Sequence, residues 1–261
     1  MHLIYLSPMD VAPYIEGETQ ALSPQSRAIL IQGIEKYKSL VKLEIPIGQI
    51  KFIVLGANGD TGTGYLKEKL AGLFKGEKTK PREIRGKTEA ELMKIELLAL
   101  LPEVAESVLY RNESKNTIEN AKTVVEILRK EGISKPIIYI VAGEFTELTW
   151  ITKCPNKYTI PSVYDKDGNK SKNPFPKFTA AISHLERVMF TFKKVLKKEF
   201  PNKTIDLQPV PASIRFGDKH ENSQNTLTNE TLWILLNTAA YFLTIYKFFT
   251  GEATDSEKVI K

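Results

Sequence analysis

The sequence predicts an α/β fold: a three-layer sandwich in which helices cover both faces of a mostly parallel sheet. Short apolar runs such as "HLIYL", "IKFIVLG" and "KPIIYIVAG" alternate with amphipathic helical patterns. This alternation is typical of parallel strands that are buried on both faces. Four polar clusters also fall at loop-to-helix junctions, "GANGD", "TEAE", "NESKNTIEN" and "SHLER". In a parallel sheet these junctions meet at the carboxyl edge, where ligands bind.

The first half of the chain supplies two strands and two helices of this fold. "HLIYLSP" reads as a strand that ends at Pro8. Ser23 followed by Pro24 has the N-cap and N1 pattern, which predicts a helix over "LSPQSRAILIQGIEKYKSLV". After the strand "IKFIVLG", Thr88 and Glu91 form a capping box that starts the helix "TEAELMKIELLALL".

The second half repeats the alternation around a long polar segment. A short strand precedes the helix in "YRNESKNTIENAKTVVEIL", and the strand "KPIIYIVAG" follows it. From about 144 to 176 the chain is polar and rich in proline, which predicts an inserted loop. A helix from "SHLER" and a late strand in "TIDLQPVPASI" come next. We expect one domain over 1–250, with an insertion at about 145–180, and a polar tail over 251–261.

Composition narrows the classes of partner. The 261 residues carry a net charge of +6, with 26% charged and 42% hydrophobic residues, as in ordinary soluble proteins. The basic residues form no stripe interleaved with aromatics, so we expect no nucleic acid partner. A mildly positive protein suits a small anionic ligand. A single cysteine, Cys154, and a start without a signal-peptide pattern predict a cytoplasmic protein.

The segment 232–249 is apolar enough to need a membrane test. "LWILLNTAAYFLTIYKFF" approaches the length of a short spanning helix, but Asn237, Thr238 and Thr244 interrupt it. We therefore expect a buried C-terminal helix and no integral membrane span, with membrane association as the alternative.

The glycine-rich turn "GANGDTGTG" offers one candidate site. Its spacing matches neither a P-loop nor a dinucleotide fingerprint. It is either a simple turn or, through Gly56, Asn58 and Gly59, a backbone cradle for an anion. Glu89 raises a similar choice, because the capping box does not need it. It either stabilises the helix start or bonds a hydroxyl or amine of a ligand.

Short polar side chains crowd the start of the next helix: Glu113, Ser114, Asn116, Thr117 and Asn120. Capping explains Asn116 together with Glu119, and Ser114 is an alternative cap. Asn120 lies one turn after Asn116 on the same face. Glu113, Thr117 and Asn120 exceed what a cap requires, and this surplus indicates a ligand site.

His184 and Arg187 lie three residues apart and therefore share a helix face. The imidazole suits acid–base chemistry near neutral pH, and the guanidinium suits a phosphate or carboxylate. The alternative is a surface salt bridge of Arg187 with Glu186 or a neighbouring carboxylate. No second histidine lies nearby, so we expect no metal site.

Taken in order, these motifs resemble the YdcF-like domain of unknown function, the group that includes the envelope proteins SanA and ElyC. The most specific match is "ESKNTIENA", which supplies Glu113, Ser114, Asn116, Thr117 and Asn120. Weaker matches are Arg27 in "SPQSRAIL", "LGANGD" in place of a Ser-Gly-Gly turn, "TEAELM", and "ISHLERV" with Leu185 where the family has methionine.

The resemblance implies a Rossmann-like α/β domain with a ligand cleft at the strand ends. One family member is associated with S-adenosylmethionine, which makes it a candidate cofactor, and others with cell-envelope maintenance. On this basis we predict a small-molecule-binding protein, and specifically an enzyme that acts on a nucleotide-like or phosphorylated ligand in that cleft. His184 and Glu113 are the candidate catalytic residues, and Arg27 and Arg187 would hold the anion. The alternative is a non-catalytic sensor or interaction protein in envelope maintenance.

Overall fold

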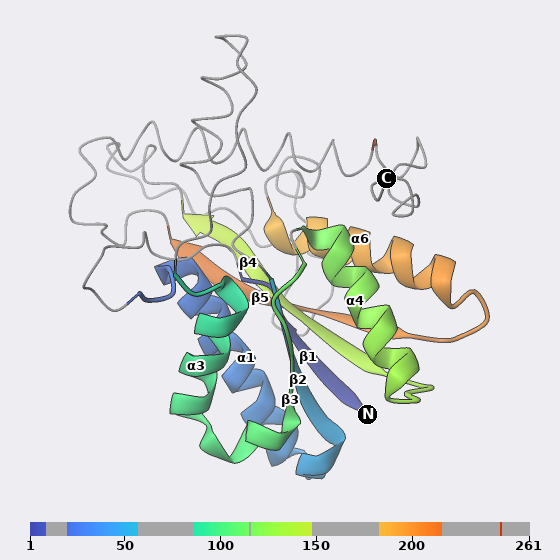
Figure 1. Cartoon of the computed structure of the whole chain (residues 1–261), viewed down its shortest axis with the longest axis horizontal. Helices are drawn as coiled ribbons and strands as arrows, with labels where there is room; N and C mark the ends of the chain where they lie inside the picture. Colours follow the sequence, from blue (N-terminus) through green and yellow to red (C-terminus); the bar gives the residue numbers. More distant parts are fainter. Residues whose placement is uncertain (9–19, 57–85, 115, 148–182, 216–245, 247–261) are drawn as a thin grey trace, which may run out of the picture.

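The computed structural model describes residues 1–8, 20–56, 86–114, 116–147, 183–215 and 246. Strands and helices alternate through these ranges, as the apolar runs and helical patterns predicted (Figure 1). In chain order the elements are β1 (His2–Leu6), α1 (Pro24–Lys42), η1 (Ile47–Gln49), β2 (Ile50–Leu55), α3 (Glu89–Leu100), η2 (Pro102–Ser107), β3 (Val108–Arg111), α4 (Thr117–Lys130), β4 (Ile137–Glu147), α6 (His184–Glu199) and β5 (Asp206–Arg215).

The sheet formed by the described strands has five members, all parallel, in the order β3-β2-β1-β4-β5. Strand β1 is central, and its Tyr5 lies opposite Ile53 of β2 and Ile140 of β4. The chain builds outward from β1 through β2 to β3, then returns to the other side of β1 with β4. This reversal between β1 and β4 is a topological switch point, the usual ligand position in open parallel sheets.

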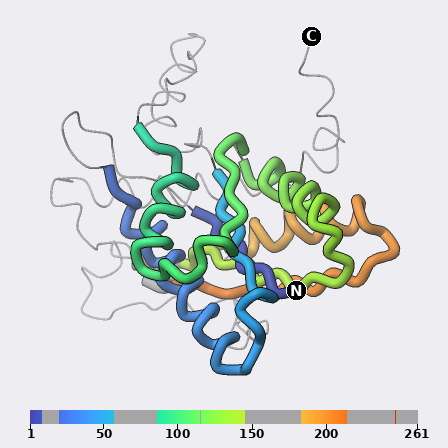
Figure 2. The backbone as a smooth tube through the Cα atoms, turned by 60° about the horizontal axis from the view of Figure 1, so that its bottom comes forward, coloured from blue at the N-terminus to red at the C-terminus, as the bar shows by residue number. Residues whose placement is uncertain are grey.

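Helices cover both faces of the sheet, which confirms the predicted three layers. On one face α1 and α3 pack on Ile4 and Phe52. On the other face α4 and α6 pack on Leu3, Tyr5 and Ile140. The two views agree on this division (Figures 1 and 2). Successive strand residues point to opposite faces, so both faces of β1 must be apolar, which explains its unbroken apolar run.

Helix α1 approaches β1 closely at Gly33. A Cβ at this position would collide with the side chain of Leu6 and touch that of Ile4. Glycine therefore sets the distance between this helix and the central strand, at some cost in helix propensity.

The predicted helix starts are confirmed. The side chains of Ser23 and Ser183 accept from the backbone N–H three residues ahead. Thr88 and Glu91 form the full reciprocal capping box. Asn116 caps α4 by accepting from the N–H groups of two first-turn residues. Local polar chemistry therefore fixes where four of the helices begin.

Strand β4 is longer than the sequence pattern indicated. We expected the strand to end at Gly143, but residues 144–147 continue it and pair with β5. Backbone pairing, rather than side-chain hydrophobicity, carries this extension. Pro209 and Pro211 lie within β5, which is tolerated because β5 is the edge strand of the described sheet.

Several predictions fall outside the described residues. These are the sites at Asn58 and Gly59, the remainder of the insertion over 148–182, the segment 232–249 except Tyr246, and the tail. Within the ranges that are described, none of the helices has the length and apolar character needed to cross a membrane.

Candidate functional site

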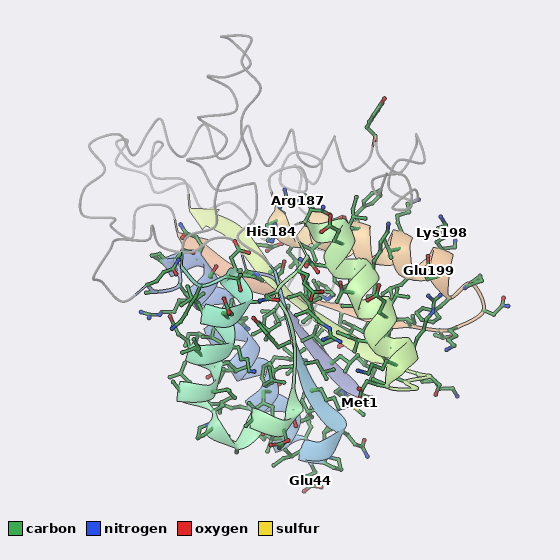
Figure 3. The ribbon with its side chains drawn as sticks, viewed as in Figure 1. Met1, Glu44, His184, Arg187, Lys198 and Glu199 are labelled. Carbon is green, nitrogen blue, oxygen red and sulfur yellow. The ribbon has the colours of Figure 1, made fainter. Side chains whose placement is uncertain are left out.

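A hydrogen-bonded trio lies where β1 ends, at the switch point of the sheet. Ser7 follows the last residue of β1, and His184 is the first residue of α6. The Oγ of Ser7 is 3.1 Å from Nε2 of His184, and Nη2 of Arg187 is 2.7 Å from Nδ1 of the same ring. Figure 3 shows His184 and Arg187 at the start of α6, at the edge of the sheet away from Met1.

These contacts determine the protonation of His184. A guanidinium can only donate hydrogen bonds, so Nδ1 of His184 is the acceptor and carries no proton. The ring proton is therefore on Nε2, which donates to Ser7. Burial and the neighbouring charge of Arg187 hold the pKa of His184 well below its usual range, so the ring is neutral near pH 7.

Tyr5 and Asn120 extend the trio into the protein. Tyr5 faces the same side of the sheet as Ser7, two residues on, and its ring packs on Phe192 at 4.7 Å between centroids. Its hydroxyl lies beside the side chains of Ser7 and Asn120, and burial raises its pKa far above the usual value. We call Tyr5, Ser7, Asn120, His184 and Arg187 the β1 polar cluster.

Three polar atoms of the β1 polar cluster are buried without a hydrogen bond to any described residue. They are the hydroxyl oxygen of Tyr5, Oδ1 of Asn120 and Nε of Arg187. Tyr5 is fully buried, and Asn120 is 9% exposed. The hydroxyl of Tyr5 lies beside Asn120 and can donate to it, so Nε of Arg187 is the atom that a further polar group would satisfy, and a buried donor without a partner costs about 1–3 kcal/mol.

The cluster also contains a charge without a counter-ion among the described residues. Arg187 forms no ion pair within those ranges, and the expected alternative, a bridge to Glu186, is not what the structure shows. Burial lowers the pKa of Arg187 to about 10, which still leaves it charged at neutral pH. A desolvated cation of this kind attracts an anion.

Two buried carboxylates flank the cluster. Glu89, in the first turn of α3, lies close enough to raise the pKa of Tyr5. Its Oε2 is 3.2 Å from where a Cβ would stand at Gly56, whose φ of +139° favours glycine. On the β4 side, Glu144 accepts a long hydrogen bond of 3.5 Å from Ser183. Predicted residues Gly56 and Glu89 are therefore brought to the same edge as the cluster.

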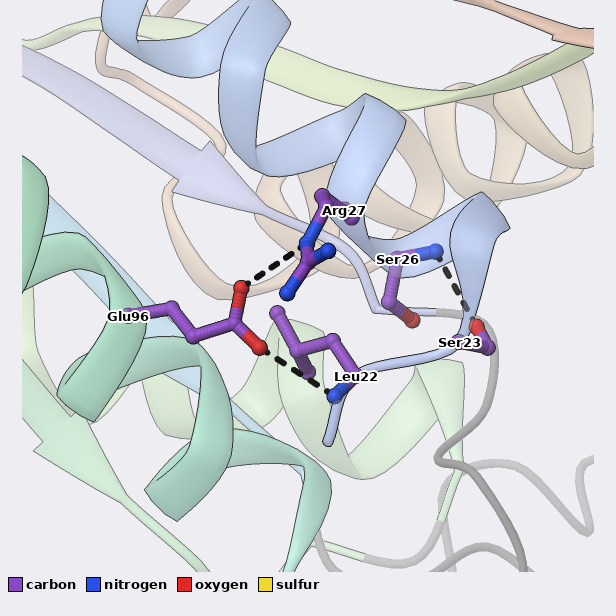
Figure 4. Close-up of polar contacts among 5 residues, drawn as sticks. All are labelled: Leu22, Ser23, Ser26, Arg27 and Glu96. Carbon is purple, nitrogen blue, oxygen red and sulfur yellow. Dashed lines mark hydrogen bonds and ion pairs between the residues drawn. The ribbon is translucent and has the colours of Figure 1, made fainter. Parts of the chain in front are cut away.

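Arg27 is not part of the β1 polar cluster and instead lies between α1 and α3. Its Nε bonds Oε2 of Glu96 on α3 at 3.1 Å, and the same carboxylate accepts from the backbone of Leu22 (Figure 4). Because α1 and α3 cover the face opposite α6, this ion pair joins two helices and does not bring Arg27 to Arg187. A ligand-binding role for Arg27 stays a prediction.

The remaining predicted residues at the start of α4 separate into local roles. Ser114 is buried and shares a 3.0 Å hydrogen bond with Thr123. Asn116 caps the helix, and its Nδ2 donates to Glu119 at 2.7 Å. Glu113 is exposed and lies near Tyr110, whose pKa it helps to raise. Thr117 is half-buried. Only Asn120 of this group joins the β1 polar cluster.

Sequence reasoning did not identify Tyr5, Ser7 or Glu144. The signal for Ser7 was its position directly after the first apolar run, where a strand reaches the ligand edge. Tyr5 lies within that apolar run, and only the two-residue repeat of a strand predicts that its side chain and that of Ser7 lie on the same face of the sheet. Glu144 is the first polar residue after an apolar strand, a position that the sequence pattern assigns to the start of the polar loop.

The side chains of the β1 polar cluster are hydrogen-bond donors and a cation rather than a set of metal ligands. Across the ranges that the structure describes, no three His, Cys, Asp or Glu side chains gather as a metal site. The β1 polar cluster supplies hydrogen-bond donors and one cation, which suit phosphate or carboxylate oxygens. No family model matches the chain, and it has no significant match among curated proteins or solved structures.

Proposed function

We propose that this protein binds a small anionic ligand, phosphorylated or nucleotide-like, at the β1 polar cluster. The observation that carries the proposal is Arg187: a charged guanidinium, bonded to a neutral imidazole, with a buried Nε that has no partner among the described residues. A phosphate or carboxylate placed here would neutralise the charge and can take two parallel hydrogen bonds.

The fold supports an anion at this position. Helix α6 begins at His184, so its free backbone N–H groups and positive dipole end lie at the same edge of the sheet. The neutral His184 adds a donor through Nε2 if the ligand replaces Ser7 as its partner. Arg187 and His184 would thus contact two oxygens of one anionic group.

The same geometry argues for binding without nucleophilic catalysis by Ser7. In a Ser-His-Asp triad a carboxylate accepts from Nδ1, which leaves Nε2 free to remove the serine proton. Here Arg187 occupies Nδ1 and forces the proton onto Nε2, so His184 donates to Ser7. This observation favours the second candidate function, a non-catalytic sensor. An acid–base role for His184 requires the ligand to displace Arg187 from Nδ1. Glu113 is exposed and lies outside the β1 polar cluster, so an acid–base role for it requires the site to rearrange.

The resemblance to the YdcF-like domain adds S-adenosylmethionine to the candidates, since its carboxylate offers the same chemistry as a phosphate oxygen. A role in envelope maintenance rests on that resemblance alone.

The test is a comparison of two arginines on the α4–α6 face. Binding of ATP, ribose 5-phosphate, inorganic phosphate and S-adenosylmethionine is measured by calorimetry for the native chain, Arg187→Gln and Arg129→Gln. Arg129 is exposed and paired with Glu199, so its loss makes the same charge change away from the cluster. We expect Arg187→Gln to weaken binding at least about tenfold, and Arg129→Gln to leave it unchanged.

Two results would contradict the proposal. One is that no anion in this panel binds the native protein. The other is that Arg187→Gln binds as tightly as the native chain while remaining folded by circular dichroism. Product analysis after incubation with each bound ligand then separates the enzyme from the sensor, because only the enzyme converts it.

A further inference from the structure

We infer that the outward side of α6 is a docking surface for an anionic membrane surface. Every exposed residue of α6 is a lysine: Lys193, Lys194, Lys197 and Lys198. These residues recur at the spacing of one helical turn, so they lie on one side of the helix, away from the side that packs on the sheet. We call the four residues the α6 lysine face. The inference does not depend on the anion site at Arg187.

The charge of the α6 lysine face is not neutralised within the protein. None of the four lysines forms an ion pair with a described residue. Between Glu186 and Glu199 the helix has no acidic residue, and Glu199 is bonded instead to Arg129 of α4 at 2.8 Å. Lys203, just beyond the end of α6, is exposed as well. Figure 3 shows Lys198 and Glu199 at this end of the helix.

Helix stability does not explain the α6 lysine face. Lys197 and Lys198 lie in the last turn, where a positive charge stabilises the negative end of the helix dipole. Lys193 and Lys194 lie one turn earlier, and each has a like charge four residues on, which destabilises a helix. The lysines therefore repel one another in the free protein, and an anionic partner would relieve this repulsion.

The side chains of this face fit a lipid surface better than a nucleic acid. Lysine ammonium groups on flexible stems act as point charges, and a cluster of about four to eight basic residues on one helix is typical of binding to anionic headgroups. Nucleic acids are also bound through arginine, hydroxyl and amide groups and through aromatic stacking. The exposed residues of α6 include none of these groups, and Phe190, whose ring centroid is 5.7 Å from Nζ of Lys194, is half-buried.

The experiment measures co-sedimentation of the full chain with two kinds of vesicle: phosphatidylcholine alone, and equal parts of phosphatidylcholine and phosphatidylglycerol. The test variant carries glutamine at all four positions of the α6 lysine face, which are exposed, so the fold should be retained and is checked by circular dichroism. The matched control removes the same charge from lysines in or beside α1 and α3, on the opposite face of the sheet: Lys38→Gln, Lys42→Gln, Lys87→Gln and Lys94→Gln.

We expect the native chain to bind the anionic vesicles at least about tenfold more tightly than the phosphatidylcholine vesicles, and added salt to remove the difference. The test variant should lose at least about tenfold in affinity for the anionic vesicles, because each lysine near such a surface contributes to binding. The control variant should stay within about threefold of the native chain. Arg187→Gln should bind the vesicles as the native chain does.

Four results would overturn the inference, and none of them bears on small-anion binding by the native chain. The first two are equal binding to both kinds of vesicle and unchanged binding in the test variant. An equal loss in the test and control variants would show that net charge acts without a defined face. Binding of a DNA duplex through these lysines, without vesicle binding, would assign the face to a nucleic acid. A loss confined to Arg187→Gln would place a lipid headgroup at the anion site instead.

Discussion

The protonation of His184 gives a pH dependence of stability that can be measured. In the folded protein its pKa is held well below 6.5 by burial and by Arg187, so the ring stays neutral as the pH falls. In the unfolded chain the same ring takes up a proton near pH 6.5. The unfolded state then binds more protons, so the stability that His184 contributes is present above pH 6.5 and is lost as the pH falls below it.

The magnitude follows from the titration of the unfolded ring. Lowering the pH from about 7.5 to about 5.5 should reduce the free energy of unfolding by about 1.4 kcal/mol through His184 alone. For a chain of this size the midpoint of thermal unfolding should fall by about 3–5 °C from this source. Few carboxylates titrate in this window, so the effect of the histidine is separable.

The assay is urea unfolding at both pH values for the native chain and for His184→Gln. Glutamine has a donor and an acceptor but does not titrate, so the variant should lose about 1.4 kcal/mol of the pH dependence whatever its absolute stability. His2→Gln serves as comparison. His2 is only partly buried and its pKa is lowered less, so its removal should change the pH dependence by a smaller amount in the same direction. An equal pH dependence in the native chain and His184→Gln would refute the neutral, Arg187-bonded histidine.

Three further substitutions test the packing and capping by urea unfolding. Gly33→Ala should destabilise by about 1 kcal/mol, because an overpacking cost of about 1–3 kcal/mol against Leu6 exceeds a helix gain of about 1 kcal/mol; Gly48→Ala, which meets no atom within 4 Å, should have little effect. Asn116→Ala should cost about 1 kcal/mol through the lost cap of α4, and an unchanged stability would contradict the capping role. Tyr5→Phe should cost about 1 kcal/mol, because its buried hydroxyl lies beside Ser7 and Asn120 and can bond them; an unchanged stability would show that the hydroxyl has no partner.

The fold was predictable because each layer leaves a separate mark in the sequence. The apolar run of β1 reports burial on both faces, and Ser23, Thr88, Asn116 and Ser183 mark where helices begin. Strand order carries no such mark. The return of β4 to the side of β1 opposite β2 depends on packing between distant elements, as does the glycine contact of α1 with β1.

The candidate site was predictable only where polar residues exceeded local need. The pair His184 and Arg187 stood out by helical spacing, and the structure joins them directly. Spacing did not show which ring nitrogen Arg187 would bond, and that contact decides whether His184 acts as donor or base. Ser7 comes from a position 177 residues away, so its contact with His184 exists only in the folded chain.

At the start of α4, most of the short polar side chains form hydrogen bonds within the helix start itself. Asn116 and Glu119 satisfy each other and the first backbone N–H groups, and Ser114 is satisfied by Thr123. Asn120 differs because it lies one turn inside the helix, on the face that packs on the sheet, where no free backbone N–H needs an acceptor. Its buried side chain lies instead beside the hydroxyl of Tyr5, which can donate to it, so a contact between α4 and the central strand accounts for an asparagine that the cap does not need.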